Sequence, residues 1–308
     1  MSPTTHRSNP IGVHAQLWGL GWEPATAERA VRSSAEAGFD LIEIPAPPVG
    51  GDRFDATARL LAEHGIGASV SLALPASADI SSDDDDAVGQ GREMLLHAVG
   101  LAAAVGADYV GGVTYAKMAL STRPVTSTGR RNAQRTLETV AEAAARHGVT
   151  VGLECINRYE TNLLNTTAQA ADFIDEIGAP NLAVHLDTYH ANVEERDMRD
   201  AVLGARGRLA YIHASENHRG VLGTGSIDWP VLFAALADVD YTGPITVETF
   251  SNAVLDAPTS GELGLWRTLW TDPTVAADEA RRFIEVHLAA HRADVRTTEP
   301  ATLDPVDR

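Results

Sequence analysis

The sequence has little cysteine and no long apolar run. Its one cysteine, Cys155, cannot form a disulfide within the chain, so a reducing compartment such as the cytoplasm is the expected location. No stretch approaches the roughly 18 apolar residues of a membrane-spanning helix. The first ten residues lack the apolar segment of a secretory signal. We therefore expect a cytoplasmic protein with no membrane partner.

Basic residues are scarce as well. Lys and Arg number 24 against 42 Asp and Glu, which gives a formal net charge of −18. Nucleic-acid backbones and anionic membrane surfaces are bound by clustered Lys and Arg, so this balance argues against both as partners. Hydrophobic and charged contents of 44% and 21% are ordinary for a globular protein, and 308 residues suffice for one large core.

Apolar strand patterns alternate with helical patterns along most of the chain. This alternation predicts βαβ units and a parallel sheet. Glycines at 38, 65, 106 and 148 follow expected helices, where a C′ glycine commonly ends a helix. The expected strands cover 11–17, 41–44, 66–72, 107–113, 149–154, 182–187, 209–213 and 245–248, and the expected helices cover 23–37, 54–64, 88–105, 130–147, 166–177, 198–205, 229–237 and 273–290.

An α/β protein with this pattern can form an open doubly wound sheet or a closed barrel. Polar residues end strands throughout the chain instead of gathering at one switch point, which favours the (β/α)8 TIM barrel. We expect one catalytic domain over residues 11–290. The polar segments 1–10 and 291–308, which contain prolines, are expected to be a disordered lead-in and a flexible tail.

The last four expected strands each end in a side chain that can bind a cation. These residues are Glu154, Asp187, His213 and Glu248. The C-terminal ends of barrel strands meet at one mouth. One such acid could be a helix N-cap or the partner of an arginine, but three acids at one mouth repel one another unless a cation lies between them. Oxygen-rich ligation with one imidazole suits Mn²⁺, Mg²⁺ or Co²⁺, and zinc also accepts these ligand types.

The alternation of side chains along a strand predicts a second polar layer beneath these ends. His185, Tyr211 and Thr246 stand two residues before Asp187, His213 and Glu248 and share their faces. We expect His185 to support the ligands without being one. Cys155, on the opposite face from its neighbour Glu154, is expected to pack under a helix.

The motifs that surround these residues are specific. They read Glu-Cys-Ile-Asn-Arg-Tyr-Glu-Thr-Asn at 154–162, His-Leu-Asp-Thr-Tyr-His-Ala-Asn at 185–192 and His-Ala-Ser-Glu-Asn-His-Arg-Gly at 213–220. They resemble the ketose 3-epimerase family, which includes the D-tagatose and D-allulose (psicose) 3-epimerases of the xylose-isomerase-like barrels. The segments 223–228, 248–251 and 263–270 fit as well, and the resemblance covers about residues 11–290.

The resemblance implies a divalent ion, usually Mn²⁺, Co²⁺ or Mg²⁺, held by Glu154, Asp187, His213 and Glu248. Glu154 and Glu248 would also be the acid/base pair. The implied activity is metal-dependent C3 epimerisation of free ketoses of the D-tagatose, D-fructose, D-allulose or L-ribulose type, through an enediolate.

The resemblance also implies how a substrate is held. Glu160, His190 and Arg219 would bind the C1–C2 end of the ketose, and Trp18 and Tyr115 would line the pocket. We further expect a homo-oligomer, either a dimer or a tetramer. The loop 115–130 has no confident counterpart in the family, so no role is assigned to it.

Several alternatives use the same barrel. An aldose–ketose isomerase or an inositol-type dehydratase would share the metal site and move a different proton. A DNA-repair endonuclease would need a basic face, which the net charge of −18 argues against. A non-catalytic sugar-binding barrel would bind a sugar without turnover. Gly223–Gly225 could cradle a phosphate, although a turn leading to an Asp228 N-cap with Pro230 behind it is the better interpretation.

Overall fold

The computed structural model describes residues 9–46, 49 and 54–298, and its parallel strands close into a barrel in the order β1 to β8. Each strand pairs with the next along the chain, and β8 pairs with β1. The expected TIM barrel is thus confirmed, and the open sheet was the wrong alternative. The strands are β1 (Ile11–His14), β2 (Leu41–Pro45), β3 (Gly67–Leu74), β4 (Tyr109–Lys117), β5 (Thr150–Cys155), β6 (Leu182–Asp187), β7 (Leu209–Ala214) and β8 (Ile245–Val247).

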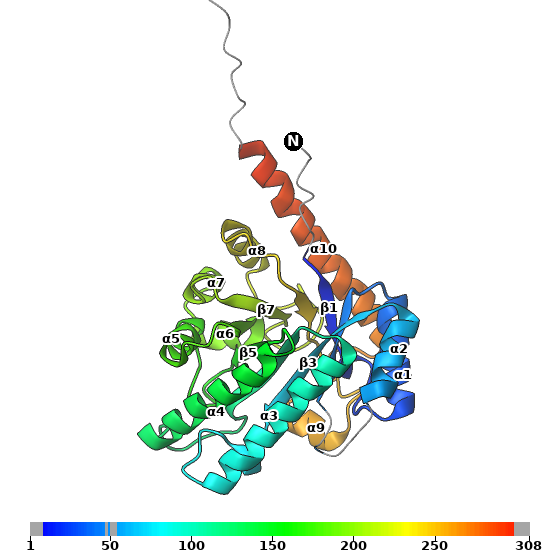
Figure 1. Cartoon of the computed structure of the whole chain (residues 1–308). Helices are drawn as coiled ribbons and strands as arrows, with labels where there is room; N and C mark the ends of the chain where they lie inside the picture. Colours follow the sequence, from blue (N-terminus) through cyan, green and yellow to red (C-terminus); the bar gives the residue numbers. More distant parts are fainter. Residues whose placement is uncertain (1–8, 47–48, 50–53, 299–308) are drawn as a thin grey trace, which may run out of the picture.

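Helices surround the strands on the outside of the barrel (Figure 1). Their starts follow capping chemistry: Asp84 accepts a hydrogen bond from the Asp86 backbone, and Thr166 forms a capping box with Gln169. The helices are α1 (Pro24–Glu36), α2 (Phe54–His64), α3 (Asp85–Val105), α4 (Ser127–Ala145), α5 (Thr167–Ile177), α6 (Thr188–Glu194), α7 (Met198–Gly204), α8 (Trp229–Asp238), α9 (Ala257–Glu262) and α10 (Pro273–Thr298), with 3₁₀ turns η1 (Ala15–Leu17) and η2 (Ala76–Ala78).

Two short helices were not expected from the sequence. α6 follows β6 directly and is capped by Asp187, and α9 lies in the segment after β8. Each has at most seven residues, which is too short for an apolar period to stand out. Both come after C-terminal strand ends and therefore border the barrel mouth.

The ends of the barrel domain differ from the expected boundaries. Asn9 donates from its side-chain amide to the carbonyls of Tyr241 and Gly243, so it is already part of the barrel. Residues 1–8 and 299–308 lie outside the described residues. The expected tail from residue 291 begins instead as helix, because α10 runs on to Thr298 and projects away from the barrel (Figure 1). No glycine or proline interrupts this stretch before Pro300.

The interior of the barrel is filled by polar and aromatic side chains, not by an open channel. The rings of Tyr109 and Tyr211 stack with their centroids 4.3 Å apart. Gly152 leaves room for this pair, because a Cβ atom there would lie 1.8 Å from the Tyr109 hydroxyl. Cys155 is buried in the hydrophobic core, as expected. Among the described helices, none is both long and apolar enough to cross a membrane.

Candidate active site

The four side chains expected at the barrel mouth meet in space. Glu154 and His213 lie near the ends of β5 and β7, Asp187 ends β6, and Glu248 follows β8 directly. Each offers one ligand atom, and these atoms all lie within 4.8 Å of one another. All four side chains are buried. The predicted convergence is therefore confirmed, while ligation by each residue stays a prediction.

His213 is oriented by carboxylates at both ring nitrogens. Nε2 lies 2.9 and 3.1 Å from the two carboxylate oxygens of Glu43. Nδ1 lies 3.4 Å from Oε1 of Glu154 and 3.5 Å from Oε1 of Glu248. Within the described part of the chain, this buried Nδ1 atom has no hydrogen-bond partner. A buried nitrogen beside two carboxylates fits a divalent ion, which would bind all three groups.

Burial changes how the cluster titrates. The pKa of Asp187 rises to about 7, mainly because burial disfavours its charged form. The same cause raises the pKa of Glu154 above its ordinary value. For His213, burial acts to lower the pKa, but the charges of Glu43 and Glu248 raise it well above the ordinary range. The cluster therefore holds protons that a divalent ion must displace.

We expect the affinity for Mn²⁺ to fall as the pH is lowered through the pKa of Asp187, about 7. Below that pH the folded, metal-free protein keeps a proton on Asp187 that binding has to release. One displaced proton weakens binding up to about tenfold per pH unit. Calorimetric titrations at several pH values between about 8 and 5.5 would measure this, and an affinity unchanged across that range would contradict it.

The same proton affects the stability of the metal-free protein. Asp187 in the unfolded chain titrates near its ordinary value of 3.8, whereas in the folded protein its pKa is about 7. Between these values the folded state binds more protons than the unfolded state. The contribution of Asp187 to the free energy of unfolding therefore decreases as the pH rises from about 4 to about 7.

Arg219 joins the cluster from the loop after β7. Its Nη1 atom lies 2.8 Å from Oδ2 of Asp187 and also contacts a carboxylate oxygen of Glu248. Nη2 lies 3.0 Å from Nε2 of His190, and the guanidinium stacks on the Tyr189 ring at 3.9 Å. The backbone of Arg219 has φ 64°, a left-handed conformation that non-glycine residues adopt at some cost.

Asp187 also acts as a helix N-cap and as the partner of an arginine, the two structural roles considered for such an acid from the sequence. Its Oδ1 atom accepts a hydrogen bond of 2.8 Å from the backbone N–H of Tyr189 and caps α6. Its Oδ2 atom is the partner of Arg219. These roles fix the carboxylate in place next to Glu154, His213 and Glu248.

Two further residues expected to hold substrate border the cluster. His190, on α6, lies 3.5 Å from Oδ2 of Asp187 and 2.8 Å, through Nδ1, from the amide nitrogen of Asn157. Asn157 also donates to Oε1 of Glu160 at 2.7 Å. Glu160, Asn157, His190 and Arg219 thus form a continuous polar chain beside the four clustered side chains.

Trp18 and Tyr115 each donate a hydrogen bond to a neighbouring part of the chain. The Trp18 indole N–H donates to the hydroxyl of Ser34 on α1 at 2.8 Å. The Tyr115 hydroxyl donates to the carbonyl of Leu164 at 2.9 Å. Both side chains are buried, and their role in lining a pocket stays a prediction.

The polar layer expected beneath the cluster is present. The Thr246 hydroxyl donates to the Tyr211 hydroxyl at 2.6 Å, and Tyr211 also shares a 2.7 Å hydrogen bond with Ser69. The fully buried His185 ring packs against His213, with centroids 4.2 Å apart. His185 can also form a smaller candidate ligand group with Glu154 and His213, so its supporting role stays a prediction.

Glu43 has a place in this site that the sequence analysis did not assign to it. This acid stands inside the apolar run of β2 and is 1% exposed. Burial acts to raise its pKa, but the charge of His213 and a hydrogen bond from it hold the pKa of Glu43 well below its usual range. His14 lies beside it, with Nε2 3.8 Å from Oε1 of Glu43. A single carboxylate on the inward face of a barrel strand was the signal that could have found this contact.

In the glycine-rich segment after β7, the Glu216 carboxylate occupies the backbone N–H of Gly223. The backbone N–H of Gly223 donates to Oε1 of the buried Glu216 at 2.8 Å, and the Trp229 indole N–H donates to the same oxygen. Asp228 caps α8 by accepting from the Val231 backbone, as expected. A carboxylate already at Gly223 disfavours a phosphate there, because the two anions would repel each other.

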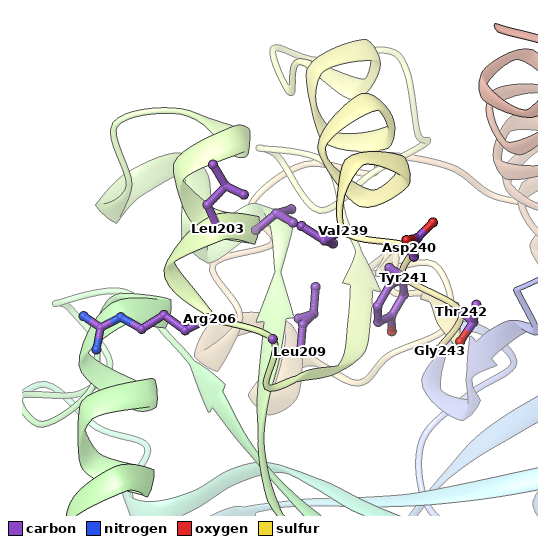
Figure 2. A pocket seen from close by; sticks show the side chains of 10 residues that line it. Leu203, Arg206, Leu209, Val239, Asp240, Tyr241, Thr242 and Gly243 are labelled. Carbon is purple, nitrogen blue, oxygen red and sulfur yellow. The ribbon is translucent and has the colours of Figure 1, made fainter. Parts of the chain in front are cut away.

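A hollow of about 360 Å³ lies at the end of the barrel opposite the four clustered side chains, beside the segments that precede β7 and β8 (Figure 2). It is lined by Leu203, Leu209 and Val239 together with residues 240–243. Two of its polar side chains are already paired: the Tyr241 hydroxyl donates to the Pro244 carbonyl, and Arg206 contacts Asp172. The hollow contains none of the four clustered side chains, so we place the candidate active site at the barrel mouth.

Comparison with known proteins gives a consistent result. Residues 31–285 match the family described as xylose isomerase-like TIM barrel. A ketose 3-epimerase from Arthrobacter globiformis is 41% identical over 91% of this chain and 97% of its own length. An L-ribulose 3-epimerase from Methylomonas sp. is 40% identical over 89% of this chain and 96% of its own length.

Solved structures agree with these relatives. The crystal structure of D-allulose 3-epimerase from Methylomonas sp. in complex with D-allulose superposes with a TM-score of 0.87 at 40% identity, covering 91% of this chain and 98% of that one. A structure of an L-ribulose 3-epimerase gives a TM-score of 0.91 at 36% identity, covering 96% and 99% of the two chains.

Proposed function

Because this chain belongs to the ketose 3-epimerase family of the xylose isomerase-like TIM barrels, we propose that it inverts the configuration at C3 of a free ketose. The observation that carries this proposal is the buried cluster of Glu154, Asp187, His213 and Glu248. Two of its carboxylates flank Nδ1 of His213 at 3.4 and 3.5 Å, from strands on different sides of the barrel.

The four clustered side chains would hold a divalent ion. Three carboxylates and one imidazole suit Mn²⁺ best, with Co²⁺ or Mg²⁺ as alternatives. When bound, the ion supplies Lewis-acid chemistry that draws electron density from the sugar oxygens next to C3. The adjacent positive charge favours the ionised form of the glutamate that accepts the proton, whereas the glutamate that donates one has to be protonated beforehand.

Glu154 and Glu248 are the proposed acid/base pair. C3 of a 2-ketose carries a hydrogen made weakly acidic by the neighbouring ketone. One glutamate takes this proton, and the electrons of the C3–H bond form the enediolate. The other glutamate then donates a proton to the opposite face of C3, which forms the new C3–H bond. Each such group commonly contributes about 10²–10⁴-fold to the rate.

The polar chain beside the cluster is proposed to hold the C1–C2 end of the sugar. Arg219 and His190 meet at 3.0 Å, and Glu160 is fixed through Asn157 at 2.7 Å. Their hydrogen-bonding groups match the hydroxyls and the ketone of a free sugar. Trp18 and Tyr115 would contribute to the rest of the pocket wall, where apolar surface meets the sugar ring or chain.

We expect turnover of free ketohexoses or ketopentoses of the D-allulose, D-fructose, D-tagatose or L-ribulose type, and little turnover of ketose 1-phosphates. The acids around Arg219 and the carboxylate of Glu216 at Gly223 disfavour a phosphate. Incubating the Mn²⁺-loaded protein with this panel and separating the products would test both expectations. Faster turnover of the phosphates, or aldose products, would favour a sugar-phosphate enzyme or an aldose–ketose isomerase.

A homo-oligomer is the proposed assembly, either a dimer or a tetramer. Large apolar side chains are exposed on loops that follow strand ends: Leu120 is 67% exposed, Tyr159 65% and Trp266 83%. Exposed aromatic residues of this kind are typical of contact surfaces. Light scattering coupled to size-exclusion chromatography would measure the mass, and a monomer at all concentrations would contradict this proposal.

A further inference from the structure

We propose that Glu43 is a positioning residue that fixes the ring orientation and the tautomer of His213, so that Nδ1 faces the ion and Nε2 keeps a proton. The inference rests on the metal site of the proposed function. It adds a residue on β2, a strand that supplies none of the four clustered side chains.

The contact crosses the barrel. β2 pairs with β1 and β3, whereas β7 pairs with β6 and β8, so Glu43 and His213 stand on strands that are not neighbours. The carboxylate nevertheless reaches Nε2 with both oxygens, at 2.9 and 3.1 Å. Both side chains are at most 2% exposed, so water does not compete for this hydrogen bond.

An imidazole without such a partner has two ambiguities. Its ring can turn over, which exchanges the places of carbon and nitrogen atoms, and a neutral ring can carry its proton on either nitrogen. The two Glu43 oxygens accept only from a protonated nitrogen, so they select the state with hydrogen on Nε2. Nδ1, 3.4 Å from Glu154 and 3.5 Å from Glu248, is then the nitrogen that releases its proton and presents a lone pair when an ion binds. Carboxylates that bind the far nitrogen of a metal-binding histidine act in this way in many proteins.

The surroundings of Glu43 support the same assignment. A buried carboxylate is costly unless it is hydrogen-bonded, and His213 satisfies it. His14 is the other imidazole nearby, at 3.8 Å, beyond hydrogen-bonding distance. Burial lowers the pKa of His14 to about 4, so this ring is neutral near pH 7 and does not take over as an ionic partner.

Mn²⁺ affinity of the sugar-free protein tests the inference without relying on catalysis. Calorimetry or competition with a chelator would compare the wild type with Glu43→Gln and Glu43→Ala. We expect Glu43→Ala to bind Mn²⁺ about 10–100-fold more weakly. Glu43→Gln should fall between it and the wild type, because its amide oxygen still accepts from Nε2–H but carries no charge. In Co²⁺-loaded protein, the visible absorption bands should shift in the same order.

Ser69→Ala is the matched control. Ser69 pairs with Glu43 in the register of β2 and β3 and is buried in the same layer, but its hydroxyl bonds to Tyr211 instead of His213. Its Mn²⁺ affinity should stay within about twofold of the wild type, against the 10–100-fold loss of a supporting residue. If Glu43→Ala does not fold, the test is whether Glu43→Gln binds Mn²⁺ more weakly than both the wild type and Ser69→Ala.

Two outcomes would overturn the inference in distinguishable ways. Folded Glu43 variants that bind Mn²⁺ as tightly as the wild type, even with a lower melting temperature, would make Glu43 a purely structural brace and leave the proposed function intact. A wild-type protein that binds no divalent ion, or one whose affinity for Mn²⁺ is unchanged by His213→Ala, would remove the metal site and with it both proposals.

Discussion

Glu154→Gln and Glu248→Gln should each lower kcat for C3 epimerisation by about 10³-fold or more, because each removes one of the two groups that exchange a proton with C3 and also weakens a ligand of the proposed ion. Both residues are buried within the same cluster. The measurement is the rate of conversion of a ketose into its C3 epimer at saturating Mn²⁺, so that reduced affinity for the ion does not account for the loss.

A buried glutamate outside the cluster provides the control. Glu216 is fully buried after β7, and its carboxylate binds the Gly223 backbone and the Trp229 indole. Glu216→Gln keeps an acceptor oxygen at the same place and should retain most of the activity. Equal losses in all three variants would mean that the effect reports folding instead of proton transfer. One of the two cluster variants should still exchange the C3 hydrogen of one epimer with solvent.

Removal of the divalent ion is the second change with a large expected effect. Exhaustive chelation should abolish epimerisation and lower the melting temperature, since a bound ion stabilises only the folded state. At a free Mn²⁺ concentration of about 1,000 times Kd, this stabilisation is about 4 kcal/mol. Scanning calorimetry with and without Mn²⁺ measures it, and adding Mn²⁺ back should restore both activity and stability.

His213→Ala is the control for this experiment. It removes the one imidazole of the cluster and leaves the three carboxylates. Its melting temperature should respond much less to Mn²⁺ than that of the wild type. Full activity in wild-type protein that elemental analysis finds free of metal would contradict the assignment of the cluster as a metal site.

Most of the fold was predictable because βαβ repeats have a strong local pattern. α2 and β6 have the expected boundaries, and the expected C′ glycines, such as Gly106 with φ 74°, adopt the left-handed conformation. The errors fall where local pattern is weak. α6 and α9 are too short to show a helical period, and α10 continues beyond residue 290 through a polar stretch with no helix-breaking residue before Pro300.

Some features of the candidate site could be predicted from the sequence and others could not. Glu154, Asp187, His213 and Glu248 were predictable because strand topology brings C-terminal ends together wherever the barrel closes. The Glu43–His213 contact was not, because it joins strands that are not neighbours across the barrel interior.

The reach of Arg219 into the cluster depends on a left-handed backbone at a non-glycine residue, which sequence patterns do not reveal. The hydrogen bond from the Trp18 indole N–H to the Ser34 hydroxyl likewise depends on the rotamer of Trp18 and on how α1 packs against it. Such contacts depend on three-dimensional packing that the order of residues along the chain does not specify.

The most direct test of the central claim is the position of solvent deuterium in the product. The Mn²⁺-loaded enzyme is run with a ketohexose in D₂O, and the C3 epimer is purified and examined by NMR. Transfer between Glu154 and Glu248 on opposite faces of C3 predicts deuterium at C3 of the product, with C1 unlabelled. Deuterium at C1 or C2 with an aldose as product, or an epimer that contains no deuterium, would contradict two-glutamate epimerisation at C3.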